Sequence, residues 1–266
     1  MTLAVVTGPN SGIGREVALG LAATGFHVVA AGRSEQRIGA LVEEISATGG
    51  SAEYLHLDLA SLGSVRTTVE EVLGSGRQVD VLVNNAGIGV NRRGLTDDGF
   101  EVHFGINHLG HFALAQGIAP VMAPGARVVS LASAMHHRAD GIDFEHVRRR
   151  TRWIGLHEYA ASKLANVLFI RELARRSEHI GAYAVHPGFV DTPLIPGWVK
   201  PFVRKSLITP AQGADTVLWC ATSTEVSGES GLYYQRRHAG TPSPAALDDA
   251  LARELWERSE TWAKTG

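Results

Sequence analysis

The sequence predicts an α/β fold in which helices flank a doubly wound parallel sheet, and three observations support this prediction. Short apolar runs alternate with helical patterns over the first half of the chain, as the strand and helix pairs of a parallel sheet would. Several of these runs are continuously apolar, which indicates strands buried on both faces. The 266 residues contain neither an internal repeat nor a linker, so we expect residues 1–266 to form a single domain.

A glycine-rich loop joins the first strand to the first helix. The strand Leu3–Val6 leads into Thr7-Gly8-Pro9-Asn10-Ser11-Gly12-Ile13-Gly14, and a helical pattern continues to Ala23. Glycines in such a loop permit a tight turn, close approach of the backbone to a pyrophosphate, and close packing of the helix on the sheet. The free amides and the dipole at the start of the helix favour phosphate there. We therefore expect a Rossmann-type dinucleotide site whose ligands include Gly8, Asn10, Ser11, Gly12, Ile13 and Gly14.

The end of the second strand bears on the choice of cofactor. The apolar run His27–Ala31 ends in Gly32-Arg33-Ser34. An acidic residue here would accept hydrogen bonds from the adenosine ribose of NAD and would repel the 2′-phosphate of NADP. Arg33 instead offers a planar guanidinium that suits a phosphate. The sequence thus favours NADP(H) over NAD(H), although an ordinary surface arginine would give the same pattern.

Two more strand and helix pairs follow, and then a buried strand with a polar end. A serine that can cap a helix opens each of the helical segments 34–48 and 61–73, on either side of the strand Ala52–Leu57. The strand Val79–Val83 ends in Asn84-Asn85-Ala86-Gly87. Amides and a glycine at the carboxyl end of a buried strand are typical of the ligand crevice of a doubly wound sheet. A plain turn is the alternative for these four residues.

The second half of the chain continues the alternation around a polar segment, 135–156. The predicted elements, in order, are a helical segment 97–119, a strand Arg127–Leu131, a helix His157–Arg176, a strand Ala182–Val185, a helix Thr209–Thr222, a strand Leu232–Tyr234 and a helix from about Pro244 to Trp262. Ser133 follows the strand, and Tyr159 and Lys163 lie four apart, on one face of the long helix. Taken alone, each could be an ordinary strand-end serine or helix pair.

Composition limits the partners and the compartment. The net charge of −2 gives no general attraction to nucleic acid or to anionic membranes. A single cysteine, Cys220, allows no internal disulfide and fits a reducing compartment. No secretory leader opens the chain, and no apolar run is long enough to cross a bilayer. We expect a cytoplasmic protein without nucleic-acid partners or a membrane anchor, whose partners are a small molecule and copies of itself.

Five motifs in this order resemble those of the short-chain dehydrogenase/reductase family over nearly the whole chain. They are the loop Thr7–Gly14, Asn84-Asn85-Ala86-Gly87, Ser133, Tyr159-x-x-x-Lys163 and His186-Pro187-Gly188. The sequence Asn107-His108-Leu109-Gly110-His111-Phe112 and the long gap between Ser133 and Tyr159 are similar to the retinol dehydrogenase and protochlorophyllide reductase branch. The resemblance implies an oxidoreductase that transfers hydride between a nicotinamide and a carbonyl or secondary alcohol.

By this resemblance the catalytic residues are Asn107, Ser133, Tyr159 and Lys163. Tyr159 would exchange a proton with the substrate oxygen, and Lys163 would lower the pKa of Tyr159 and hold the nicotinamide ribose. Ser133 would orient the substrate oxygen, and Asn107 would bind a water that relays protons from Lys163 to solvent. Further cofactor contacts implied by the resemblance are Asp58 and Leu59 at the adenine, Asn85, Ala86 and Gly87, and Pro187, Gly188, Val190 and Thr192 near the nicotinamide carboxamide.

We expect distinct roles for two segments of the second half of the chain, 189–208 and 135–156. Residues 189–208 contain Trp198, Phe202 and several prolines, so we expect a lid over an apolar substrate, and we interpret 135–156 as an insertion that varies in the family. The histidines and aspartates of that insertion lack the spacing of a metal site, so we expect no metal. Reduction of a conjugated C=C bond and non-catalytic NADP(H) binding remain alternatives, and a homodimer or homotetramer is expected.

Overall fold

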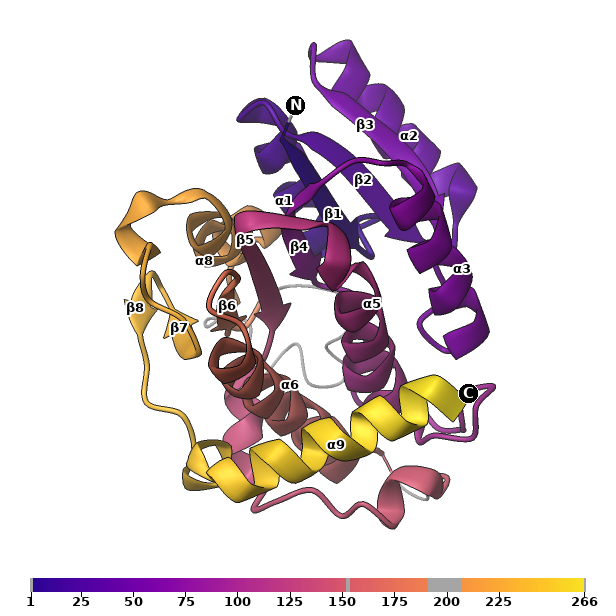
Figure 1. The fold of residues 1–266 in the computed structure, drawn as a ribbon, viewed down its shortest axis with the longest axis vertical. Coiled ribbons are helices and arrows are strands. Elements are labelled where there is room, and N and C mark those ends of the chain that lie inside the picture. Colours follow the sequence, from indigo (N-terminus) through magenta and orange to yellow (C-terminus); the bar gives the residue numbers. More distant parts are fainter. Residues whose placement is uncertain (1, 152–153, 191–206, 266) are drawn as a thin grey trace.

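The computed structural model describes residues 2–151, 154–190 and 207–265, and these residues form one eight-stranded sheet (Figure 1). The strands lie in the order β3-β2-β1-β4-β5-β6-β7-β8. Their bounds are β1 Leu3–Thr7, β2 His27–Gly32, β3 Ser51–His56, β4 Val79–Asn84, β5 Met122–Leu131, β6 Gly181–Val185, β7 Leu232–Gln235 and β8 His238–Ala239. All neighbouring strands are parallel except β7 and β8. The strand order reverses between β1 and β4, which confirms the doubly wound prediction.

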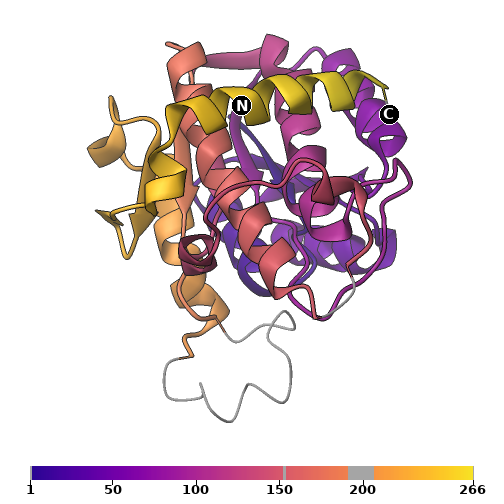
Figure 2. The ribbon, with the colours of Figure 1, turned by 90° about the horizontal axis from the view of Figure 1, so that it is seen from below.

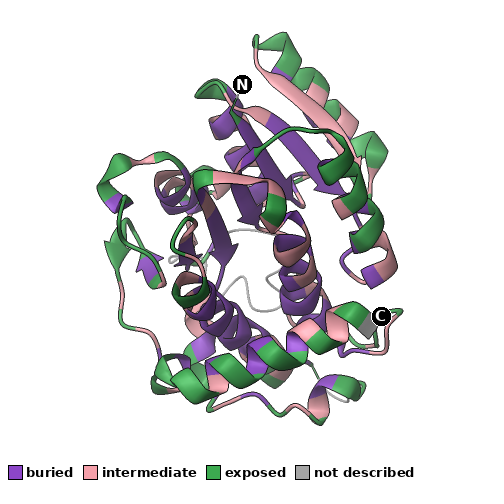
Figure 3. Cartoon of the chain, viewed as in Figure 1, coloured by how far each residue is buried: buried purple, intermediate pink, exposed green. Residues whose placement is uncertain are grey.

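Helices cover both faces of the sheet. The main helices are α1 Gly12–Ala23, α2 Glu35–Ala47, α3 Leu62–Gly74, α5 Gly110–Ile118, α6 Leu156–Arg176, α8 Pro210–Thr222 and α9 Asp249–Thr265. Apolar residues of α1, α2 and α8 share one core with the sheet, and those of α3, α5 and α6 share the other. Helix α9 crosses α5 and α6 on the outside of this second layer (Figures 1 and 2). The central strands are buried, the edge strands β3 and β8 are half-buried and exposed, respectively, and the outer helix faces are exposed (Figure 3).

The predicted helix starts are confirmed by their caps. The side chain of Ser34 accepts a hydrogen bond from the amide of Arg37, and Ser61 does the same for Ser64. Thr209 forms a reciprocal capping box with Gln212. These side chains satisfy amides that a helix leaves unpaired in its first turn. Because of this local chemistry, the sequence located these starts to within a residue.

The helical segment predicted over 97–119 is shorter and less regular than expected. Helix α4 begins only at Val102, because the carboxylate of Glu101 accepts hydrogen bonds from the first amides. The backbone then passes through a π-helical turn, Gly105–Leu109, before α5. Such turns place one extra residue in a helix and are frequent at functional sites. Here the extra turn contains Asn107.

Two predictions near the C-terminus were incomplete. Strand β8 was missed, because it has only two residues and its turn lacks a glycine signal. Arg236 and Arg237 form that turn with φ of +50° and +60°. The terminal helical pattern divides at Asp248 into a 3₁₀ turn, Pro244–Leu247, and α9. Within the described ranges, no helix combines the length and apolar character that crossing a bilayer requires.

Two histidines of the second core are buried in the neutral form. His108 and His111 are almost fully enclosed beside α5. Burial, followed by the neighbouring charge of His111, lowers the pKa of His108 to about 3. Burial also lowers the pKa of His111 to about 4, although the carbonyl of Asn107 accepts a hydrogen bond from its ring. Histidine in an unfolded chain has a pKa of about 6.5.

These depressed pKa values predict loss of stability in acid. As the pH falls below about 6.5, the unfolded chain binds protons that the native histidines do not, so the free energy of unfolding falls by about 2 kcal/mol per histidine at pH 5. Urea unfolding at pH 7.5 and pH 5 measures this. His108→Gln should lower stability at pH 7.5 and reduce the loss between the two pH values. An unchanged pH dependence in this variant would contradict the assignment.

Candidate active site

The carboxyl ends of β1 and β4 are joined by hydrogen bonds of Thr7 and Asn85. The hydroxyl oxygen of Thr7 accepts the amides of Asn85 and Ala86 at 3.0 and 2.9 Å. Nδ2 of Asn85 donates to the carbonyls of Thr7 and Gly8 at 2.8 and 3.2 Å. A Cβ added to Gly14 would lie 2.3 Å from Nδ2 of Asn85, so only glycine fits there. The phosphate loop and the loop after β4 are therefore one connected unit.

A cleft of about 780 Å³ opens along this edge of the sheet. It is lined by twelve of the residues that the sequence proposed as cofactor contacts, namely Gly8, Asn10, Ser11, Gly12, Ile13, Gly14, Arg33, Asp58, Leu59, Asn85, Ala86 and Gly87. The volume lies within the range of small-molecule sites, and the start of α1 points its free amides at the loop. The close fit around Gly14 keeps side chains out of the phosphate end. The residues present thus fit a dinucleotide.

A second arginine lies at the far end of the cleft. Arg37, in the first turn of α2, lines the cleft together with Arg33, and both side chains are exposed. In the part of the chain that the structure describes, neither guanidinium forms an ion pair, whereas Arg15 pairs with Glu44. Sequence reasoning missed Arg37, although its position four residues after Arg33 was a signal. Gln36, Ile88, Ile106 and Leu131 also line the cleft and were not predicted.

Among the described residues directly after β6, 186–190, none lines the cleft. The side chain of Val190 is buried near α8, and a Cβ at Gly213 would lie 2.5 Å from it. A backbone bridge joins Val190 to Ile208. Pro187 and Gly188 are half-buried at the end of β6. Thr192, and with it residues 191–206 of the expected lid, including Trp198 and Phe202, lie outside the described residues.

Tyr159 and Lys163 lie on one face of α6, as their spacing predicted. Lys163 is 5 % exposed, and its Nζ donates a hydrogen bond to the carbonyl of Leu131 at 2.8 Å. Nζ lies 5.8 Å from the centre of the Tyr159 ring. Burial lowers the pKa of Lys163 to about 8. Leu131 lines the cleft, so the ammonium group lies beside the nucleotide site.

The expected pKa shift of Tyr159 was wrong in direction. We expected Lys163 to lower this pKa, but burial of the phenol raises it, and a hydrogen bond with the side chain of Ser133 opposes the rise. Burial sets the direction because it penalises the charged phenolate more than the hydrogen bond with Ser133 favours it. The hydrogen bond nevertheless brings Ser133 and Tyr159 together, as the motifs implied.

Asn107 anchors the loop that follows β4. Its side chain accepts the amide of Ile88 at 2.8 Å and donates to the carbonyl of Ile88 at 3.1 Å. It also donates to the hydroxyl of Ser162 at 3.0 Å. A Cβ at Gly87 would lie 3.0 Å from Oδ1 of Asn107 and 3.9 Å from Nζ of Lys163, so the three residues adjoin. A relay through a water bound to Asn107 stays a prediction.

His136 holds Ser133 in place. Its Nδ1 donates to the carbonyl of Ser133 at 2.6 Å, and its Nε2 accepts the amide of Ser243 at 3.1 Å. His136 belongs to the 135–156 segment, where histidines and aspartates had raised the question of a metal. Within the described ranges, no group of three histidine, cysteine or acidic side chains is arranged to hold a metal ion. The sequence did not reveal this supporting role.

Comparison with known proteins agrees with the geometry. The profile of the family described as short chain dehydrogenase matches residues 2–200. Human dehydrogenase/reductase SDR family member 13 is 41 % identical, over 99 % of this chain and 73 % of that protein. Human retinol dehydrogenase 14 is 38 % identical, over 96 % and 84 %. Mouse polyprenol dehydrogenase is 37 % identical, over 96 % and 81 %.

Solved structures share the whole architecture. A crystal structure of a protein from Mycobacterium paratuberculosis superposes with a TM-score of 0.84 at 33 % identity, covering 100 % of this chain and 94 % of that one. A short chain dehydrogenase from Burkholderia cenocepacia, solved in complex with NADP, has a TM-score of 0.74 at 28 % identity, covering 93 % and 98 %. With the profile match, these relatives show that the chain belongs to the short chain dehydrogenase family of oxidoreductases.

Proposed function

We propose that this chain transfers hydride between NADP(H) and the carbonyl or secondary alcohol carbon of a small apolar substrate, with Tyr159 as the acid and base. The observation that carries the proposal is the grouping of Tyr159 with Ser133 and Lys163 beside Leu131, at the inner end of the nucleotide cleft. A carbonyl oxygen needs a proton donor within hydrogen-bond reach, and the Tyr159 phenol is available for this role.

The residues would act in the following way during reduction. NADPH, when bound, supplies the hydride that reaches the carbonyl carbon. The phenol of Tyr159 gives its proton to the carbonyl oxygen, and the hydroxyl of Ser133 orients that oxygen. The ammonium of Lys163 stabilises the phenolate that Tyr159 becomes. Oxidation of an alcohol would run the same transfers in reverse.

The cofactor preference rests on Arg33 and Arg37. Two exposed guanidiniums without ion-pair partners in the described chain line the cleft where the adenosine ribose would lie. A phosphate monoester dianion there would gain charge-assisted hydrogen bonds that a hydroxyl would not. The relative solved with NADP supports the same preference.

Exposed apolar side chains lie close in sequence to Tyr159 and to Pro187-Gly188. Ile154 and Leu156, on either side of the Gly155 cap of α6, are 42 % and 39 % exposed, and Phe189 is 54 % exposed. Exposed apolar side chains of this kind suit a surface that binds apolar ligands. Retinol and polyprenol, which name two relatives, are alcohols on apolar chains. We therefore propose an apolar alcohol, or the matching aldehyde or ketone, as the substrate class.

The test of the reaction is NADPH oxidation with a panel of apolar aldehydes, ketones and enones. Tyr159→Phe should lower turnover at least a hundredfold, because the proton donor is lost, while the Kd for NADPH changes less than threefold. Tyr54→Phe, on the exposed outer strand β3, is the matched control and should keep full activity. Turnover of enones alone would indicate C=C reduction, and NADPH binding without turnover of the panel would count against an enzyme.

The cofactor preference has its own test. Arg33→Ala and Arg37→Ala should each raise the KM for NADPH about tenfold and change the KM for NADH less than twofold, because only NADPH carries the 2′-phosphate. Arg253→Ala, an exposed position on α9, is the control. Equal effects on both cofactors would contradict the assignment.

The pKa of Lys163 predicts the pH dependence of reduction. Because burial lowers this pKa to about 8, the ammonium form is present below pH 8 and is lost above it. At saturating NADPH we expect kcat for a carbonyl to be level below pH 7 and to fall up to tenfold per pH unit above pH 8. Stopped-flow rates from pH 6 to 9.5 measure this, and a profile that stays level to pH 9.5 would refute it.

A further inference from the structure

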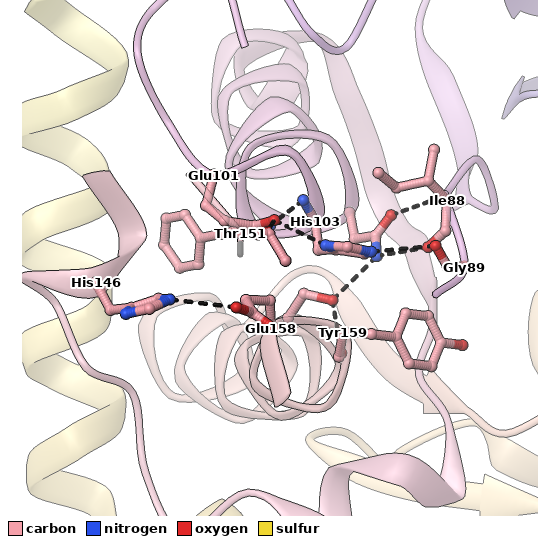
Figure 4. A network of polar contacts seen from close by, with 11 residues as sticks. Ile88, Gly89, Glu101, His103, His146, Thr151, Glu158 and Tyr159 are labelled. Atoms are coloured by element: carbon pink, nitrogen blue, oxygen red, sulfur yellow. Dashed lines mark hydrogen bonds and ion pairs between the residues drawn. The ribbon is translucent and has the colours of Figure 1, made fainter. Parts of the chain in front are cut away.

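A buried polar network lies next to the ring of Tyr159 (Figure 4). Its centre is the carboxylate of Glu101, which is 1 % exposed and accepts four hydrogen bonds. Oε2 accepts the amides of His103 and Phe104 at 2.9 and 3.1 Å. Oε1 accepts Nδ1 of His103 at 2.8 Å and the hydroxyl of Thr151. One carboxylate thus joins the start of α4 to the segment that precedes α6.

Hydrogen bonds hold the His103 ring between Glu101 and Gly89. This side chain is fully buried, with Nδ1 2.8 Å from Oε1 of Glu101 and Nε2 3.1 Å from the carbonyl of Gly89. Burial opposes ionisation of Glu101, but the bonds from His103, Thr151 and Phe104 outweigh it and hold its pKa below the ordinary value. Glu101 and His103 therefore form a buried hydrogen-bonded pair.

The His103 ring contacts both the loop after β4 and the residue that precedes α6. On one side it holds Gly89, next to Ile88, which lines the cleft and is itself held by Asn107. On the other side it packs against Gly155, where an added Cβ would lie 2.5 Å from the ring and where φ is +73°. The ring of Tyr159 lies edge-on to His103, with centroids 6.3 Å apart at 77°.

Stability alone does not account for this pair. Burial of a carboxylate and an imidazole costs free energy in desolvation, and apolar side chains of similar volume often serve stability as well or better. The pair has directional bonds to two segments outside its own, at Gly89 and at Thr151, which apolar packing cannot supply. Such bonds fix distances between segments more strictly than dispersion contacts do.

We propose that Glu101 and His103 are positioning residues that set Tyr159 at the right distance from the loop 87–89 that lines the cofactor cleft. This inference rests on the proposed function of Tyr159. Neither residue lines the cleft, and His103 reaches it only through Gly89, next to the lining residue Ile88, so we expect the pair to act mainly on the rate of hydride transfer and little on NADPH affinity. Displacement of a catalytic group by about 1 Å can lower a rate about a hundredfold.

The test uses the full chain, NADPH and the best carbonyl of the panel. His103→Gln and Glu101→Gln should each lower the single-turnover rate of NADPH oxidation about tenfold to a hundredfold, with the Kd for NADPH within threefold of wild type. The double variant should fall no further than the worse single one, because the two residues act as a unit. His108→Gln is the matched control: it removes a buried histidine from the same helical segment, bound to Ser259, and should lower Tm but keep the rate.

Thr151→Val is a milder variant that tests the same network if His103→Gln or Glu101→Gln does not fold. It removes one hydrogen bond from Glu101 and should lower the rate about threefold to tenfold with little change in Tm. If His103→Gln folds, a single-turnover rate above half of the wild-type rate would overturn the inference. If His103→Gln does not fold, an unchanged single-turnover rate in Thr151→Val would overturn it. The loss of turnover in Tyr159→Phe would then leave the proposed function intact. A wild-type chain that binds NADPH and reduces no carbonyl would overturn both.

Discussion

The hydroxyl of Thr7 is the point on which the site depends. It accepts two amides of the loop after β4 and lies 2.9 Å from Nε2 of His111, whose Nδ1 donates to the carbonyl of Asn107. Because His111 uses Nδ1 as a donor, its Nε2 accepts the Thr7 proton. One buried side chain thus joins the phosphate loop, the loop after β4 and the helical segment with Asn107. Without these hydrogen bonds the position of the cofactor cleft relative to the catalytic residues would not be fixed.

Other buried polar side chains extend the same principle to the remaining loops. His103 holds Gly89, Asn107 holds Ile88, and His136 holds the backbone of Ser133. Each of them gives a hydrogen-bond partner to a backbone carbonyl or amide of a loop. Loops at the carboxyl end of a sheet are short of regular backbone partners, so side chains supply additional ones. The motif residues are therefore held in part by side chains outside the motifs, such as His103 and His136.

Helix α9 covers the outside of this arrangement. Its Trp256 packs on Phe112 and Phe169 with ring centroids 5.0 and 5.9 Å apart, and Ser259 bonds to His108. Trp262 lies 5.3 Å from Phe100, next to Glu101. Both tryptophans are thus packed against aromatic residues of the same chain. The last helix also covers His108, to which Ser259 bonds.

Local chemistry was enough to predict the strand and helix order, the caps at Ser34 and Ser61, and the glycine-rich loop, whereas cleft residues such as Asp58 and Leu59 came from the family resemblance. Apolar periodicity, glycine spacing and capping act over a few neighbouring residues, so they can be recognised in the sequence. The sequence did not predict the roles of His103, His136 and Arg37. It also did not predict the two-residue strand β8 or the raised pKa of Tyr159. Each depends on burial or on partners far along the chain, such as Ser243 beside His136 and Thr151 beside Glu101. Desolvation and long-range hydrogen bonds arise only when the folded chain brings these groups together and excludes water from them.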